Sequence, residues 1–359
     1  MTFPVTDNIV RTARHTSFYL ACGPAHGTPI IFLHGWPELS ISWRHQLACF
    51  AQLGFHAIAP DMRGYGRSSV YARHEDYALE HAVTDMLELL DSLGRDRAIW
   101  AGHDWGSPVV WSIASHFPDR CFGVANLCVP YVAGGFAPDN LLPLVDRRVY
   151  PEAECPVGQW DYMLFYEQNF DKARRDFEAN IPNTVKALFR KGNPAGRHKP
   201  SRTAFVRSQG GWFGAAGQAP ERPLDTDVMT EPEFHTYVAA LERTGFFGPN
   251  SWYMNHERNR AFAATSVNKG RIALPVLFLH ALYDLTCETV DSRLAEPMRA
   301  DCTDLTEVVV SSGHWMAQEK PTDVNAALAR WLARRFPDLW PVTRFSAADL
   351  AQPTAAPAG

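Results

Sequence analysis

The sequence predicts an α/β protein: a mostly parallel sheet with helices on both faces and an inserted helical cap. Near both ends of the chain, short apolar runs of strand length alternate with segments whose apolar residues recur at helical spacing. This alternation stops in the middle of the chain and resumes later. The chain has 359 residues, more than the roughly 250–300 that one hydrophobic core usually holds. We therefore expect one large α/β domain that carries an inserted subdomain.

The N-terminal part of the core is predicted from its alternating and fully apolar runs. Residues 9–22 alternate between polar and apolar, which is typical of an antiparallel hairpin at a sheet edge. Apolar residues at helical spacing over 79–93 predict a helix, which Gly94 closes. Buried strands are expected in four apolar runs: 29–33, 56–60, 98–101 and 122–129.

The segment 131–269 interrupts this pattern and is expected to form a helical cap, or lid, subdomain. Long irregular stretches alternate there with helical patterns, such as 160–169, and Thr230 to Glu233 form a capping box at the start of another helix. Residues 252–255 are expected to begin a further helix.

The rest of the predicted core follows the cap. A buried strand is expected at 275–280 and the last strand at 306–310, and a final helix stops at Pro337. We therefore assign 1–130 and 270–340 to the core. The Ala/Pro-rich end, 341–359, is expected to be a flexible tail.

Composition argues against several classes of partner. Hydrophobic residues make up 46% of the chain, the formal net charge is only −5, and no long basic or acidic run is present. We therefore expect no nucleic-acid partner. No stretch reaches the roughly 18 apolar residues of a membrane span. Seven scattered cysteines without a C-x-x-C pair, and a start without the pattern of a signal peptide, predict reduced thiols in a cytoplasmic protein.

The segment 102–106, Gly-His-Asp-Trp-Gly, lies between a predicted strand and a predicted helix. It fits the Gly-x-nucleophile-x-Gly elbow of α/β-hydrolases, with Asp104 at the centre. An aspartate, with a reference pKa of about 3.9, is already ionised at neutral pH. It can attack a saturated carbon and form an alkyl-enzyme ester. The alternative is an Asp that caps the following helix.

Two more strand ends carry candidate groups. His34-Gly35-Trp36-Pro37 follows a buried strand and is expected to be an oxyanion-hole loop, in which a cis bond before Pro37 turns the backbone inward. The alternative is an ordinary turn.

Asp284 and His314 follow the last two predicted strands and complete the chain order nucleophile, acid, histidine. Asp284 could instead cap a helix, and His314 could be structural. Asp291 lies in a predicted helix and is a poorer candidate for the acid.

These motifs, together with Asp161-Tyr162 and Trp252-Tyr253 in the cap, make the chain similar to the epoxide hydrolases of the α/β-hydrolase fold, over roughly Val10 to Pro337. The resemblance implies an eight-stranded sheet, no cofactor, and a small epoxide as substrate. It implies catalytic roles for five residues and oxyanion-hole roles for the backbone of two: Asp104 as nucleophile, His314 as base, Asp284 as its acid partner, Tyr162 and Tyr253 as epoxide-oxygen donors, and Trp36 and Trp105. Tyr166, one turn after Tyr162, could take the place of Tyr162.

The expected reaction is therefore opening of an epoxide to a vicinal diol through a covalent ester on Asp104, which water activated by His314 and Asp284 then cleaves. A haloalkane or haloacid dehalogenase with the same Asp104 is the closest alternative, although its halide would leave the two tyrosines without a role. A non-catalytic ligand receptor is a second alternative. No histidine pair has metal-ligand spacing supported by a third ligand, so no metal is expected. A homodimer is one oligomeric state that the sequence leaves open.

Overall fold

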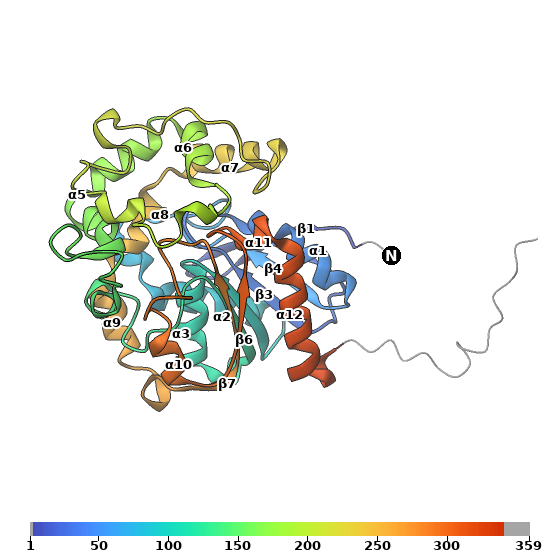
Figure 1. The fold of residues 1–359 in the computed structure, drawn as a ribbon. Coiled ribbons are helices and arrows are strands. Elements are labelled where there is room, and N and C mark those ends of the chain that lie inside the picture. Colours follow the sequence, from blue (N-terminus) through green and yellow to red (C-terminus); the bar gives the residue numbers. More distant parts are fainter. Residues whose placement is uncertain (1–2, 341–359) are drawn as a thin grey trace, which may run out of the picture.

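A single eight-stranded sheet forms the centre of the molecule (Figure 1). The computed structural model describes residues 3–340; the expected flexible tail, 341–359, lies outside them. The strands β1 and β2 form the antiparallel hairpin that 9–22 predicts, β2 also pairs antiparallel with β4, and all other neighbours are parallel. This sheet confirms the predicted fold class. In spatial order the strands are β1 (Thr6–Arg11), β2 (Thr16–Cys22), β4 (His56–Pro60), β3 (Pro29–Leu33), β5 (Ala98–His103), β6 (Cys121–Leu127), β7 (Ile272–Ala281) and β8 (Cys302–Val310).

The central strands are buried because helices cover both faces of the sheet. Every residue of β3 and β5 is buried, as expected for parallel strands between two helical layers. In Figure 1, α12 (Pro321–Arg335) lies on one side of the sheet and α3 (Gly106–His116) on the other. The strand β8 forms an edge, and Val309 there is 53% exposed. The remaining helices of these layers are α1 (Arg44–Gln52), α2 (Leu79–Ser92), α10 (Glu296–Asp301) and α11 (Met316–Glu319).

The segment 131–269 contains helices and no strand within the described residues. Figure 1 shows α5, α6, α7 and α8 beyond one end of the sheet, whereas α9 packs against α2. The capping box at Thr230 forms as predicted, because Glu233 accepts the Thr230 backbone N–H. The helices of this segment are α4 (Pro138–Leu141), α5 (Asp161–Glu178), α6 (Ile181–Leu188), α7 (Glu231–Thr244), α8 (Phe247–Ser251) and α9 (His256–Ala263).

Two local predictions are wrong. Trp252–Met254 form a single 3-10 turn between α8 and α9 rather than the start of a helix. The surroundings of Asp291 are also not helical, because the Glu288 carboxylate accepts the backbone N–H groups of Val290, Asp291 and Ser292. Such local side-chain bonds compete with helix formation.

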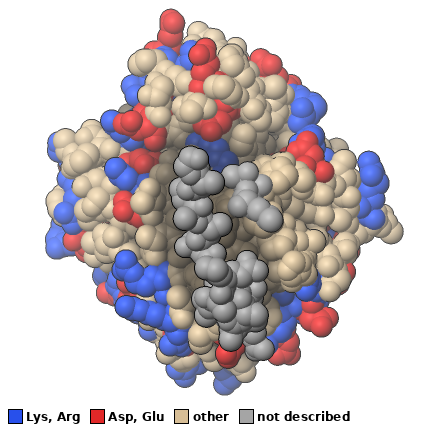
Figure 2. All heavy atoms as spheres, turned by 90° about the vertical axis from the view of Figure 1, so that its right-hand side faces the viewer, with Lys and Arg blue, Asp and Glu red and all other residues tan. Residues whose placement is uncertain are grey.

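The surface carries charges of both signs. Basic and acidic side chains are interspersed over the face drawn in Figure 2. No helix in residues 3–340 combines the length and the hydropathy that crossing a bilayer would require. All seven cysteines are unpaired thiols, as expected from their spacing.

Replacing Gly106 with Ala should destabilise the protein far more than replacing Gly94 with Ala. A Cβ on Gly106 would lie 2.1 Å from the backbone oxygen of Leu33, so β3 and α3 would have to separate. A Cβ on Gly94 meets nothing within 4 Å, and only its left-handed φ of 65° opposes the change. We expect a loss of about 1–2 kcal/mol for Gly94→Ala and a clearly larger one for Gly106→Ala, measured by urea unfolding. Equal losses of unfolding free energy in the two variants would contradict the tight contact between Gly106 and Leu33.

Candidate active site

Asp104 sits on a sharp turn between β5 and α3. Its backbone has a φ of 49°, a left-handed conformation that non-glycine residues rarely adopt. The turn needs glycine at both ends: a Cβ on Gly102 would lie 2.5 Å from the oxygen of Gly106. The Asp104 side chain does not cap α3; its Oδ1 accepts a hydrogen bond from the backbone N–H of Trp36 instead. The helix-cap alternative is therefore excluded.

The loop after β3 supplies this hydrogen bond. The Trp36 N–H lies 2.7 Å from Asp104 Oδ1, and the Trp36–Pro37 peptide is cis, as expected. A Cβ on Gly35 would lie 2.4 Å from Asp104 Oδ1 and 2.6 Å from the Trp105 backbone nitrogen. Both expected oxyanion-hole nitrogens thus lie near the carboxylate; of these two, the described structure shows a hydrogen bond to it from Trp36 alone.

Asp284 and His314 lie at the ends of β7 and β8 and meet Asp104. Asp284 Oδ2 is 2.6 Å from His314 Nδ1, and His314 Nε2 is 3.4 Å from Asp104 Oδ2. The second oxygen of Asp284 accepts the backbone N–H groups of Thr286 and Cys287, each at 3.0 Å. No helix begins there, so the helix-cap alternative for Asp284 is also excluded.

The charges in this site shift the pKa values of Asp284 and His314. Burial would raise the pKa of Asp284, but the charge of His314 and its hydrogen bond hold that pKa below the usual value. Burial alone would lower the pKa of His314, but the charge of Asp284 and the hydrogen bonds to both carboxylates raise it well above the usual value. Asp284 and Asp104 thus both favour the protonated form of the His314 ring.

Tyr162 and Tyr253 face the nucleophile from the segment 131–269. Tyr162 lies on α5 and Tyr253 in the turn after α8; their ring centroids are 5.5 Å apart, and both rings line the same cavities as Asp104. Burial raises the pKa of both phenols well above its usual value, so both are neutral O–H donors. Tyr166 stacks on Tyr253 at 4.5 Å but lines neither cavity, so the geometry favours Tyr162 over Tyr166.

The larger of the two cavities is open to solvent and has a volume of about 450 Å³. Trp212, from the long irregular stretch before α7, forms part of its wall and packs against Trp36, with ring centroids 5.8 Å apart. Leu188, Arg190 and Lys191 also line this cavity. The stretch around Trp212 therefore lines the pocket.

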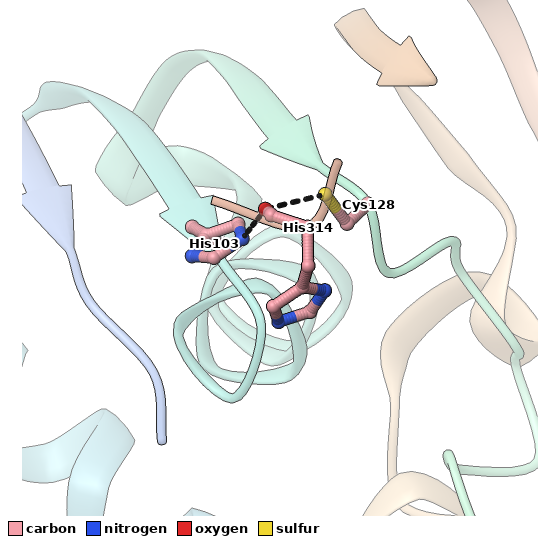
Figure 3. Close-up of side chains that lie close together, drawn as sticks. All are labelled: His103, Cys128 and His314. Carbon is pink, nitrogen blue, oxygen red and sulfur yellow. Dashed lines mark hydrogen bonds between the residues drawn. The ribbon is translucent and has the colours of Figure 1, made fainter. Parts of the chain in front are cut away.

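Two side chains, those of His103 and Cys128, contact the backbone of His314 (Figure 3). The carbonyl oxygen of His314 lies 2.7 Å from His103 Nε2 and 3.3 Å from the Cys128 thiol. The other ring nitrogen of His103 lies 2.7 Å from Glu38, which also accepts the Gly35 N–H. Glu38 and Cys128 were not predicted as site residues. The only sequence signal for Glu38 was its place directly after the 34–37 motif.

His103, Cys128 and His314 lie close enough together to suggest a metal site. Their hydrogen bonds point to another role. Burial would lower the pKa of His103, but the charge of Glu38 raises it to about 10, so the ring is a cation that donates from both nitrogens. A protonated imidazole offers no lone pair to a metal. The group is best described as a clamp on the His314 carbonyl.

A carboxylate elbow, an acid and a histidine after β5, β7 and β8 define a protein of the α/β-hydrolase fold. The profile of the alpha/beta hydrolase fold family matches residues 28–321. The chain is 32% identical over 309 residues to epoxide hydrolase A of Mycobacterium tuberculosis, covering 85% of this chain and 91% of that protein. The chain therefore belongs to the epoxide hydrolase family within the α/β-hydrolases.

Two further comparisons agree with this placement. Bifunctional epoxide hydrolase 2 of Sus scrofa is 32% identical over 307 residues; the match covers 85% of this chain but 51% of that protein, so the chain spans about half the length of this relative. The crystal structure of epoxide hydrolase A from Mycobacterium thermoresistibile superposes with a TM-score of 0.75 at 29% identity, covering 92% of this chain and 98% of that one.

Replacing one member of the pair of Glu38 and His103 should lower the free energy of unfolding more than replacing both members. We expect His103→Gln to lower the free energy of unfolding by about 3–5 kcal/mol, because it leaves the Glu38 carboxylate buried without its cation. The double variant with Glu38→Gln should lose less than the sum of the two single variants in urea unfolding. Additive losses would contradict a charged pair.

The same pair predicts a pH dependence. His103 has a pKa of about 10 in the folded protein and about 6.5 when unfolded. The stabilisation by the raised pKa is therefore complete below about pH 6.5 and is lost as pH rises through about 10. Unfolding measured across this range should show the decline in the wild type and a weaker one in the double variant.

Proposed function

We propose that this protein hydrolyses epoxides to vicinal diols through a covalent ester on Asp104. The observation that carries this proposal is the arrangement around one carboxylate. One oxygen of Asp104 is held by the Trp36 N–H, the other faces His314, and two neutral phenols line the cavity with it. In this proposal 131–269 is a cap that supplies the two phenols. The core supplies Asp104, Asp284 and His314.

In the first step, Asp104 Oδ2 attacks one ring carbon of the epoxide. The bond between that carbon and the epoxide oxygen breaks, and its electron pair goes to the oxygen. Tyr162 and Tyr253 donate hydrogen bonds to this oxygen, and one of them passes it a proton. Oδ1 remains in the oxyanion hole and becomes the carbonyl oxygen of the ester.

In the second step, water cleaves the ester at the protein's own carboxyl carbon. Formation of the ester removes the negative charge of Asp104, so the pKa of His314 falls. The ring gives its proton to the phenolate left by the first step, and the neutral Nε2 then takes a proton from water. The hydroxide attacks the Asp104 carboxyl carbon, and negative charge develops on Oδ1, where the Trp36 and Trp105 N–H groups can stabilise it. The bond between the carboxyl carbon and Oδ2 then breaks. Oδ2 takes the proton of the new carboxyl group and leaves as part of the diol, and Asp104 is again a carboxylate with one oxygen from water.

The dehalogenase alternative uses the same nucleophile but needs no proton donor. A halide leaves as a stable anion, so the two buried phenols would have no chemical role in its departure. The phenols beside Asp104 therefore favour an epoxide as substrate.

Replacing His314 with Gln should stop the reaction at the ester, because no base remains to activate water. Incubation with a small epoxide should add the mass of the epoxide to the peptide that contains Asp104, measured by mass spectrometry. In wild-type protein, a single turnover in heavy-oxygen water should give a diol free of the solvent label. A labelled first diol would contradict the covalent ester.

Replacing both Tyr162 and Tyr253 with Phe should slow ester formation by about 10²–10⁴-fold, the usual contribution of general acid catalysis. The measurement is ester formation in the His314→Gln background. Tyr166→Phe is the matched control, because this phenol stacks on Tyr253 outside the cavities. An unchanged rate in the double variant would contradict the proton-donor role.

The pH dependence of ester hydrolysis should follow His314. The ring must be neutral to accept a proton, so the rate should fall as pH falls through its pKa in the ester. Asp284→Asn removes the main charge that raises this pKa. We expect its profile to shift to lower pH and its maximum to fall by up to about 10⁴-fold. Asp291→Asn, an exposed control, should change neither. An unshifted profile in Asp284→Asn would contradict the pairing.

A further inference from the structure

Two cavities of very different size meet at the nucleophile. The outer one has a volume of about 450 Å³ and opens to solvent, whereas the inner one has a volume of about 10 Å³. Four residues line both: Asp104, Tyr162, Tyr253 and Cys287. A substrate atom bonded to Asp104 and facing the phenols is therefore at the junction, and its substituents must extend into one cavity or the other.

Apolar side chains form the rest of the lining of the inner cavity. Its remaining lining residues are Trp105, Pro108, Val129, Phe136 and Met163. Met163 is 1% and Val129 3% exposed, so neither can move into solvent to make room. A volume of about 10 Å³ corresponds to roughly one water-sized sphere. Because protein interiors are close-packed, a larger group would force these side chains out of place.

We propose that the inner cavity restricts this protein to epoxides in which one ring carbon carries at most a methyl group. This inference rests on the proposed function. The two ring carbons lie side by side between Asp104 and the phenols, so their substituents diverge toward opposite cavities. Long or bulky substituents fit only the outer cavity.

Met163 and Phe136 set this limit from two separate elements. Met163 follows Tyr162 on α5, and Phe136 lies in the loop before α4, where its ring packs edge-on against Trp160 with centroids 5.5 Å apart. Neither side chain carries a group that takes part in the chemistry. They therefore act as specificity-determining residues, and their size should change the choice of substrate.

The test uses three isomers of epoxyoctane that differ only in the position of the ring: terminal, methyl-substituted, and central with a propyl group on each carbon. Wild-type kcat/KM, measured by diol release, should be within about tenfold for the first two and at least about 100-fold lower for the central isomer. Similar values for all three would overturn this inference while leaving the proposed function intact. No diol from any isomer would overturn both.

Substitutions of cavity-lining residues test which side chains set the size limit of the inner cavity. Met163→Ala should reduce the preference for the terminal over the central isomer by at least about tenfold. Phe136→Ala, a change in a loop rather than a helix, should act in the same direction. Leu188→Ala, in the wall of the outer cavity, should leave this ratio of kcat/KM values unchanged. Equal changes in ratio for Leu188→Ala and Met163→Ala would contradict the assignment of the inner cavity.

Discussion

The active site depends on one carboxylate held at a left-handed backbone position. Asp104, at a φ of 49°, is raised from the end of β5, and this places its two oxygens in different surroundings. One oxygen receives the Trp36 N–H and the other faces His314. A strained residue persists only where its surroundings determine its conformation. Here Gly102 and Gly106 provide the space, because neither position admits a Cβ.

Buried charges in this site are paired, and the pairs are connected. Asp284 and Asp104 flank the ring of His314, while His103, itself paired with Glu38, donates a hydrogen bond to its backbone carbonyl. An isolated buried charge would be expensive, but each of these has a partner of opposite sign. The position of His314 is therefore fixed from both its ring and its backbone. This leaves the charge of Asp104, which ester formation removes in the proposed mechanism, as the variable part of the network.

The residues to which we assign catalytic roles could be identified from the sequence because each follows a recognisable local pattern. Asp104 lies in a glycine-bounded turn, and Asp284 and His314 follow apolar runs that end at one edge of a parallel sheet. Glu38 and Cys128 lack such a pattern. They come from the ends of different strands, and only the pairing of β3, β5 and β6 brings them behind His314. The helix expected around Asp291 failed for a related reason, since Glu288 bonds to the local backbone.

The sequence by itself determined the order of strands and helices, the interruption at 131–269, and the kinds of group available for catalysis. Hydrophobic periodicity and turn residues act over a few positions, so they can be read without the fold. Tertiary structure alone decided which tyrosine reaches the cavity, that Trp212 lines its wall, and how small the inner cavity beside Met163 is. These properties depend on packing between segments that are distant in the chain, and no local pattern encodes those distances.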